Sequence, residues 1–257
     1  MDLIADHISH RFGALEVLHE VSFAVRTGEV VAIVGPSGCG KSTLLSILGG
    51  LLQSSAGQAE LGGAPSADSL NPLTFVFQDF ALLPWSTVEA NVEFPLLHTA
   101  LSTSERRALV DDALRRTSLS DFRATYPKQL SGGMRQRVGI ARALAVRPAI
   151  LLMDEPLSAL DSQTRELLME DFIRLLADGA MGAVYVTHNL EEAVRLADRI
   201  VVLSRRPGRV REVVTVPMAR AERGSPEQRG KLVALQNELW SLIRNEAIDA
   251  EREVQHA

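Results

Sequence analysis

The sequence predicts an α/β fold built on a mostly parallel β-sheet core, with an N-terminal antiparallel β layer and an inserted α-helical part. Three observations support this prediction. Short apolar runs alternate with stretches of helical periodicity, the pattern of parallel strands joined by crossover helices. A glycine-rich loop directly follows one of these runs. With 257 residues, 46% of them hydrophobic, the chain can bury a sizeable core in one or two domains.

Near-continuous apolar runs predict the strands of the parallel core, because strands covered on both faces need no polar alternation. Ahead of them, Val21, Phe23 and Val25 alternate with polar or small residues, as in a half-exposed antiparallel strand. We therefore expect an antiparallel layer beside the parallel core. The four predicted parallel strands are Val30–Val34, Ile150–Met153, Ala183–Thr187 and Ile200–Leu203.

Residues 85–145 are predicted to form a mainly helical insertion. Within this stretch, residues 102–118 have the periodicity of an amphipathic helix. Ser102 and Glu105 have the spacing of a capping box at the start of this helix. In this stretch the sequence therefore predicts helices without strands between them.

The C-terminal residues 217–257 are predicted to form a polar linker followed by a helical tail. Leucines recur in the tail at helical spacing, and an apolar stripe of this kind favours a helix that docks on the chain's own core. The stripe consists of Leu232, Leu235, Leu239 and Leu242.

Charge and composition argue against several classes of function. The formal net charge of -5 disfavours a protein that coats nucleic acid, so we expect no nucleic-acid partner. Cys39 is the single cysteine, which rules out an intrachain disulfide and makes the cytosol the default compartment. The N-terminal residues lack an apolar run of signal-peptide type, and the longest apolar stretches are far shorter than the roughly 18 to 20 residues of a membrane-spanning helix.

The stretch "GPSGCGKS", residues 35–42, has the pattern of a phosphate-binding loop. It lies between an apolar run and a helical pattern, which is the context that this motif requires. Its glycines would let backbone N–H groups face phosphate oxygens, Lys41 would contact the β and γ phosphates, and the Ser42 hydroxyl would bind Mg²⁺. The alternative is a glycine-rich turn without a ligand. The candidate nucleotide-binding residues are Gly35, Pro36, Ser37, Gly38, Cys39, Gly40, Lys41, Ser42 and Thr43.

A pair of acidic residues ends the apolar run "ILLM". Asp154 and Glu155 would lie at the carboxyl edge of the sheet, where open α/β sheets bind their ligands. Asp154 could hold Mg²⁺, and Glu155 could orient or deprotonate a water that attacks the γ phosphate. Alternatively, both are solvated acids at a strand end.

A second possible anion site lies in "LSGGMRQR", residues 130–137. Ser131, Gly132 and Gly133 stand at the predicted start of a helix, where N–H groups and the helix dipole favour an anion. One chain would then carry two phosphate-binding elements.

Taken together, "GPSGCGKST", "LSGGMRQR", "LLMDEP", "SALD" and "VTHNLEEA" resemble the motifs of the ATP-binding cassette (ABC) ATPases, in the same order. The resemblance covers residues 1 to about 210. It implies a P-loop NTPase (RecA-like) core with an inserted helical subdomain, and it implies that ATP and Mg²⁺ bind. The domains would then be an ABC nucleotide-binding domain at 1–216, with the helical subdomain at about 85–145, and a linker and helical tail at 217–257.

The same resemblance assigns roles to individual residues. Phe12 would stack on adenine, although it could instead be a core residue. His188 would contact the γ phosphate, although a histidine at a strand end is more often structural. Asp161 would cross the dimer interface, cap the next helix, or do both. Gln78 would contact Mg²⁺ or the attacking water, and would act beside Glu155 and His188 in catalysis. The implied Mg²⁺ ligands are Ser42, Gln78 and Asp154.

In this family two chains pair head to tail, so each ATP lies between one chain's phosphate loop and the partner's "LSGG" element. The resemblance therefore implies a homodimer on ATP binding. The stretch "FQDFALLPWSTVEANVEFPL" is most similar to importers of the nitrate, sulfonate, taurine and bicarbonate group. Expected partners are integral-membrane permease subunits and, indirectly, a periplasmic solute-binding protein. The chain would lie peripherally on the cytoplasmic side of the inner membrane.

Two other classes of protein remain as alternatives. A soluble ABC ATPase acting on DNA or ribosomes would carry long coiled coils or two fused cassettes, and the sequence shows neither. A small-molecule kinase could use the same phosphate loop, but the "LSGGMRQR" element argues against it.

Overall fold

A computed structural model describes residues 1–177, 179 and 181–255, with side chains described up to Arg244. The chain forms two compact units. The first consists of Met1–Ala64 together with Leu176–Ala257, and the second is Pro65–Leu175. Within the described residues, no helix has the length and apolar content needed to cross a membrane.

An antiparallel sheet forms the N-terminal part of the first unit. Its strands are β1 (Asp2–Phe12), β2 (Leu15–Arg26) and β4 (Ala56–Gly62), in the order β2-β1-β4. Val21 and Val25 of β2 are buried as predicted, whereas Phe23 between them is only half-buried, so the alternation holds at two of its three positions. The strands of this sheet pair antiparallel. The predicted antiparallel layer is therefore confirmed.

Parallel strands form the second layer of the first unit. β3 pairs in parallel with β7 on one side and with β8 on the other, and β9 runs antiparallel to β8. Every residue of β3 and β7 is buried, which explains their continuous apolar sequences. The predicted runs match these strands to within one residue. The strands are β3 (Val30–Val34), β7 (Gly182–Val186), β8 (Arg199–Leu203) and β9 (Val210–Thr215).

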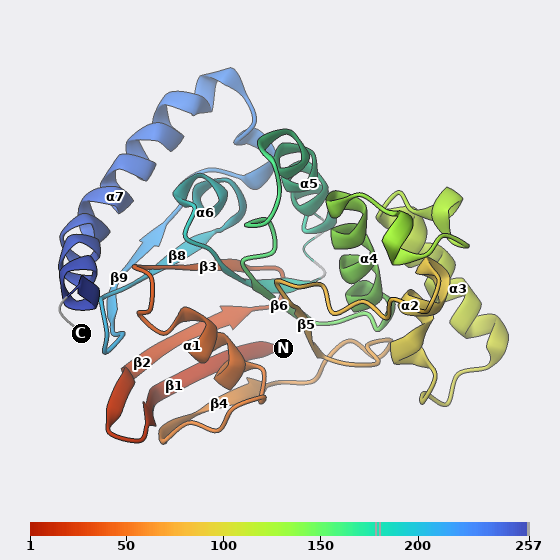
Figure 1. The fold of residues 1–257 in the computed structure, drawn as a ribbon, viewed down its shortest axis with the longest axis horizontal. Coiled ribbons are helices and arrows are strands. Elements are labelled where there is room, and N and C mark those ends of the chain that lie inside the picture. Colours follow the sequence, from red (N-terminus) through yellow and green to blue (C-terminus); the bar gives the residue numbers. More distant parts are fainter. Residues whose placement is uncertain (178, 180, 256–257) are drawn as a thin grey trace. The chain divides into compact units, whose positions relative to one another are not determined.

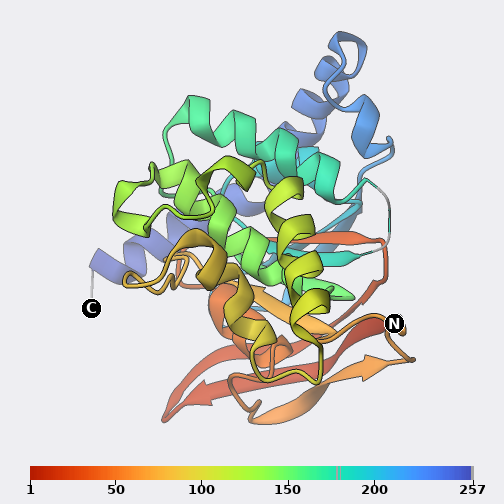
Figure 2. The ribbon, with the colours of Figure 1, turned by 90° about the vertical axis from the view of Figure 1, so that its right-hand side faces the viewer.

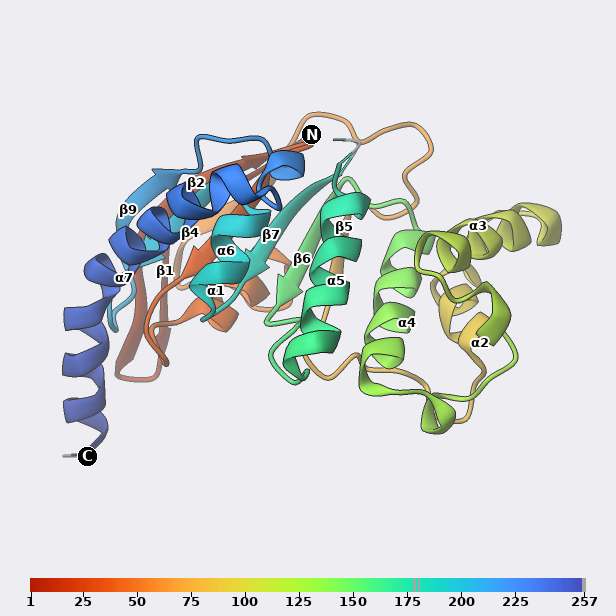
Figure 3. The same cartoon turned by 90° about the horizontal axis from the view of Figure 1, so that it is seen from above.

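Three helices accompany the strands of this unit: α1 (Lys41–Leu48), α6 (Leu190–Leu196) and α7 (Pro226–Gln255), together with the 3₁₀ turn η4 (Arg220–Glu222). The long helix α7 runs beside α6 in the views of Figures 1 and 3. Its leucine stripe is buried at positions 232, 235 and 239, so the helix docks on its own unit as expected. It begins at Pro226, inside the predicted linker, because the first turn of a helix has no partner for the N–H that proline lacks.

The second unit combines a parallel strand pair with helices, shown in yellow to green in Figure 2. A helix of this unit carries the predicted capping box: Glu105 N–H donates to Ser102 Oγ at 3.3 Å, and Ser102 N–H donates to Glu105 Oε2 at 2.7 Å. The elements are β5 (Leu73–Val76), β6 (Ile150–Asp154), α2 (Val88–Glu93), α3 (Thr103–Arg116), α4 (Gly132–Ala145), α5 (Ser162–Leu175) and the 3₁₀ turns η1 (Phe94–Leu96), η2 (Ser120–Phe122) and η3 (Pro127–Gln129).

Helices α2, α3 and α4 share one apolar core. Val92 of α2, Leu114 of α3 and Val138 of α4 are at most 1% exposed. Arg123 links α2 and α3 at the surface, because its guanidinium pairs with Glu89 of α2 and with Asp111 of α3 at 2.8 Å. The helical part therefore has a hydrophobic core of its own.

Truncation of this core should destabilise the second unit. We expect Leu114→Ala to lower the free energy of unfolding by about 2–5 kcal/mol, because it leaves a cavity among packed helices. Leu97→Ala is the matched control, since Leu97 is half exposed, and should change it by less than about 0.5 kcal/mol. Urea denaturation followed by circular dichroism measures both; equal midpoints would contradict the assigned core.

Candidate functional site

The phosphate loop joins the end of β3 to the start of α1, and glycines set its shape. Gly40 caps α1 in a left-handed conformation with φ of 104°. A Cβ atom on Gly40 would lie 2.8 Å from Leu18 Cδ2, and one on Gly35 would lie 2.9 Å from Leu203 O. Side chains at these positions would therefore clash, and the loop can approach its neighbours only with glycine.

Lys41 extends its ammonium group into this loop. Its Nζ donates to the carbonyl oxygens of Gly35 at 3.0 Å and Pro36 at 2.9 Å, and the side chain is buried. A buried ammonium is stabilised when an anion compensates its charge. Gly38 has a positive φ and no atom within 4 Å of where a Cβ would lie, so the tip of the loop is open. The loop, Lys41 and the first N–H groups of α1 therefore fit a phosphate.

Cys39 lies inside the loop as a packing residue. Its side chain is buried, and burial raises the pKa of the thiol, against the smaller opposite effect of the Lys41 charge. The Cys39 carbonyl would be only 2.3 Å from a Cβ on Gly208. A second glycine-dependent segment therefore supports the phosphate loop, and the sequence pattern did not mark it.

Phe12 lies at the end of β1 and is not a core residue. Its side chain is 52% exposed, and its ring meets the buried His10 ring edge-on at 4.6 Å between centroids. An exposed aromatic ring held by a neighbour can stack on a planar ligand.

His188 is exposed at the end of β7, beside a buried polar network. Glu192 of α6 accepts hydrogen bonds at 2.8 Å from the hydroxyl groups of both Tyr185 and Thr187. Asn189 caps α6: its Oδ1 accepts from Glu191 N–H at 2.9 Å and from Glu192 N–H at 3.3 Å. The side-chain oxygen of Asn189 therefore satisfies N–H groups of the first helical turn, which have no partner within the helix.

In the second unit, Glu155 follows β6 and has a left-handed backbone with φ of 43°. A non-glycine residue in this conformation is strained, and such strain is concentrated at functional sites. Ser158 Oγ donates to the Glu155 carbonyl at 2.9 Å and accepts from Gln78 Nε2 at 3.2 Å. Ser158, the first residue of the "SALD" motif, therefore links Gln78 to the segment that carries Asp154 and Glu155, a role that was not predicted from the sequence.

The loop after Gln78 is fixed to helix α4. Phe80 and Ala81 both have positive φ angles, of 55° and 44°. The Arg142 guanidinium donates to both of their carbonyl oxygens, each at 2.6 Å. Arg142 is half-buried, and this burial lowers the pKa of its guanidinium. Arg142 thus holds the loop after Gln78 against α4, the helix that begins with the "SGG" element.

Ser131 caps helix α4, with its Oγ accepting from Met134 N–H at 3.2 Å. Gly132 and Gly133 form the first turn. A Cβ on Gly133 would lie 2.4 Å from Thr164 Cγ2 of α5, so glycine is needed for these two helices to pack. Ser131 is exposed and Gly132 is half-buried, so the helix start is accessible at these two residues.

Asp161 caps helix α5. Its Oδ1 accepts from the backbone N–H groups of Gln163 at 3.1 Å and Thr164 at 3.0 Å, and its Oδ2 accepts from the Thr164 hydroxyl at 2.7 Å. The Thr164 N–H bond, followed by the Thr164 hydroxyl bond, lowers the pKa of this carboxyl. The helix-capping interpretation of Asp161 is confirmed, and its role at a dimer interface stays a prediction.

The candidate residues are thus divided between the two units. The first unit brings together the phosphate loop and the elements that end in Phe12 and His188. The second carries Gln78, Asp154 and Glu155, together with the helix starts at Ser131 and Asp161.

Comparison with known proteins gives consistent matches. Residues 18–158 match the family described as ABC transporter. The taurine import ATP-binding protein of Chromobacterium violaceum is 41% identical over 244 residues, which are 92% of this chain and 94% of that protein. The bicarbonate transport ATP-binding protein of Synechocystis sp. is 37% identical over 240 residues, which are 92% of this chain and 83% of that protein.

Solved structures agree with these matches. A dimeric structure of the bacterial ABC transporter cassette MJ0796 is similar with a TM-score of 0.71 and 35% identity, covering 84% of this chain and all of that one. The same cassette in a post-hydrolysis state bound to ADP and Pi gives a TM-score of 0.71 and 34% identity at the same coverage. With its glycine-shaped phosphate loop and its mostly parallel sheet, this chain belongs to the ABC transporter family and is an ABC ATPase.

Proposed function

We propose that the chain is the ATP-hydrolysing subunit of an ABC importer, which dimerises around two ATP molecules and powers solute uptake through a separate permease. One observation carries the proposal. A buried lysine inside a glycine-shaped loop and an accessible serine-glycine-glycine helix start are two anion-binding elements on one chain.

ATP would bind to the first of these elements. The loop N–H groups and Lys41 would hold its phosphates, and the exposed Phe12 ring would stack on adenine. Mg²⁺, held by Ser42, Gln78 and Asp154, would neutralise charge that develops on the phosphates.

Hydrolysis would depend on three residues of this chain. Glu155 would orient the attacking water and accept its proton, and its strained backbone supports a functional role for this position. Gln78 would contact the same water, and its bond to Ser158 restrains its amide. His188 would donate a hydrogen bond to the γ phosphate.

A second copy would complete each site. In this proposal the Ser131 hydroxyl and the N–H groups of Gly132 and Gly133 contact the γ phosphate of ATP held by the partner, and Asp161 lies near the same interface. The proposal is supported by the dimeric form in which the similar cassette MJ0796 was solved. Closure would then depend on the phosphate that hydrolysis removes.

The importer assignment rests on the relatives' names and on the loop after Gln78. Taurine carries a sulfonate group and bicarbonate is an anion, so we propose a small solute with an anionic group, of the nitrate, sulfonate or taurine type. Trp85, in the segment next to this loop, is 74% exposed, and exposed tryptophans are enriched at the centres of protein interfaces. We propose that this segment receives the permease, which would hold the chain at the cytoplasmic face of the membrane, with a periplasmic solute-binding protein on the other side.

Replacing the proposed catalytic carboxylate should separate binding from hydrolysis. We expect Glu155→Gln to lower kcat by at least about 10²-fold, because the amide cannot accept a proton from water, and to leave ATP binding intact. Size-exclusion chromatography with Mg·ATP should then show a stable dimer. Lys41→Ala is the contrasting variant and should lose ATP affinity itself.

Mixing two inactive variants tests whether the sites are shared. A Lys41→Ala chain combined with a Ser131→Arg chain can form one intact composite site per dimer, so up to half of the ATPase activity should return. Full activity of either variant alone, or a Glu155→Gln chain that stays monomeric with saturating Mg·ATP and permease, would contradict the proposed dimer.

The permease contact can be tested with two exposed tryptophans. We expect a permease gene beside the gene for this chain, and co-expression of the two should bring the chain into the membrane fraction. Trp85→Ala should weaken this association by about 30-fold, as for an interface hot spot of about 2 kcal/mol. Trp240 of α7 is 51% exposed, so Trp240→Ala is the matched control. It should leave the association with the permease unchanged. Equal losses in both variants would place the contact elsewhere.

A further inference from the structure

We propose that Arg223 is a positioning residue of the ATPase: it clamps the C-terminal end of helix α6 and thereby sets the place of His188 at the other end. The clamp consists of Asp198 and the segment Met218–Arg223. The proposal rests on the role proposed above for His188.

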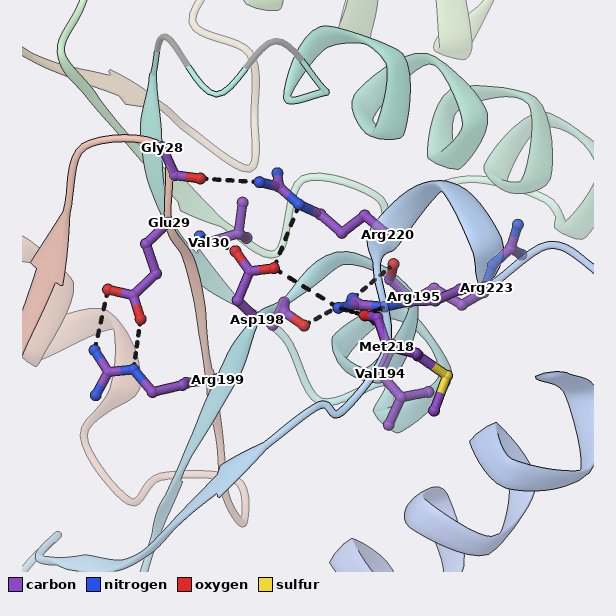
Figure 4. A network of polar contacts seen from close by, with 11 residues as sticks. Gly28, Glu29, Val30, Val194, Arg195, Asp198, Arg199, Met218, Arg220 and Arg223 are labelled. Atoms are coloured by element: carbon purple, nitrogen blue, oxygen red, sulfur yellow. Dashed lines mark hydrogen bonds and ion pairs between the residues drawn. The ribbon is translucent and has the colours of Figure 1, made fainter.

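Arg223 is buried and its guanidinium binds main-chain carbonyls (Figure 4). Its Nη1 lies 3.3 Å from the oxygen of Val194, 3.2 Å from that of Arg195 and 2.7 Å from that of Ala197. These carbonyls belong to the end of α6, where the last turn of a helix has no partners of its own. A cation at this end also interacts favourably with the helix dipole.

The other side of the guanidinium binds the C-terminal segment itself. Arg223 Nε and Nη2 donate to the Met218 carbonyl at 3.1 and 2.8 Å. One side chain therefore joins the turn after β9 to the end of α6. Burial lowers the pKa of Arg223 to about 10, the nearby Asp198 opposes this and Arg220 adds to it, so the cation stays protonated at neutral pH.

Asp198 extends the clamp to strand β3. Its Oδ2 accepts from Val30 N–H at 2.9 Å, while its Oδ1 faces Arg220 Nε at 3.5 Å and Arg223 Nη2 at 3.7 Å. Arg220 also donates to the Gly28 carbonyl at 2.9 Å (Figure 4). Val30 begins the strand that leads to the phosphate loop. Asp198 therefore fixes the end of α6 relative to that strand.

Helix α6 is short enough to transmit this restraint. It has seven residues, so it spans only about 10 Å, and a helix of this length has little stability without tertiary contacts. His188 lies two residues before its first turn. The start of α6 is held by Asn189, Thr187 and Glu192, and its end by Arg223. Loss of the end contact would let the short helix shift as a whole, which moves its cap Asn189 and with it the adjacent His188.

The hydrophobic contacts of the tail would survive loss of the cation. Leu232, Leu235 and Leu239 of α7 remain buried without help from Arg223, so a substitution there changes the placement of α6 more than the presence of the tail. This distinguishes a positioning role from a general role in folding.

The test compares Arg223→Met and Arg223→Lys with Arg229→Met, a control at an exposed arginine of α7. We expect Arg223→Met to lower kcat by about 10- to 100-fold, the range for displaced catalytic groups, with the Kd for ATP changed less than about twofold. Arg223→Lys, which keeps the charge but not the planar fork, should give an intermediate kcat. The kcat is calculated per ATP-binding site, because unfolded chains bind no ATP and would otherwise lower the apparent kcat.

Two further measurements decide the outcome. Combined with His188→Ala, Arg223→Met should cause little additional loss of kcat, because both act through the same group. Amide exchange should accelerate in residues 188–197 and not in β7. Losses that multiply in the double variant, a Kd for ATP that weakens in step with kcat, or unchanged kcat in both Arg223 variants would overturn the proposal.

The failure of this proposal can be told from failure of the proposed function. If His188→Ala alone leaves kcat unchanged, the role of His188 is wrong and the clamp proposal falls with it. If His188→Ala lowers kcat and Arg223→Met does not, only the clamp proposal is wrong. If Arg223→Met fails to fold, the same comparisons are made with Arg223→Lys.

Discussion

The structure depends most on a buried ammonium in a loop that only glycine permits. Lys41 holds its charge between the carbonyls of Gly35 and Pro36 because the loop turns tightly enough to bring them there. That turn requires glycines where the loop touches Leu18 and Leu203. Strand β3 and helix α1 fix the two ends of the loop, and the surrounding apolar core excludes water from the lysine. A positive charge held in this way has its strongest compensation from a bound phosphate.

Much of the fold could be predicted because its causes are local. The apolar run Val30–Val34 is bounded by Glu29 and Gly35, and it is buried on both faces, so pattern and strand coincide. The capping box at Ser102 needs only a serine and a glutamate three residues apart. The phosphate loop and the helix start at Ser131 are also contiguous in sequence, which is why both anion-binding elements were visible there.

The contacts that position these elements were not visible in the sequence. Arg142 and Arg223 bind backbone carbonyls, and every residue offers a carbonyl, so no residue type marks the partner. Ser158 joins Gln78 to the Glu155 segment over 80 residues of chain. The left-handed backbone at Phe80, Ala81 and Glu155 was also unexpected, because the sequence has no glycine there and tertiary contacts override the local preference.

The two guanidinium contacts share one physical logic. Each holds an element that carries a proposed reacting group: Arg142 the loop of Gln78, and Arg223 the helix that follows His188. A carbonyl acceptor neither titrates nor carries a full charge, so these contacts depend on the planar geometry of arginine more than on charge pairing. Lysine would keep the charge and lose the fork. Contacts to main-chain carbonyls outside the motifs therefore help to position the proposed reacting groups. This explains why the motifs identify these groups but do not predict how they are held in place.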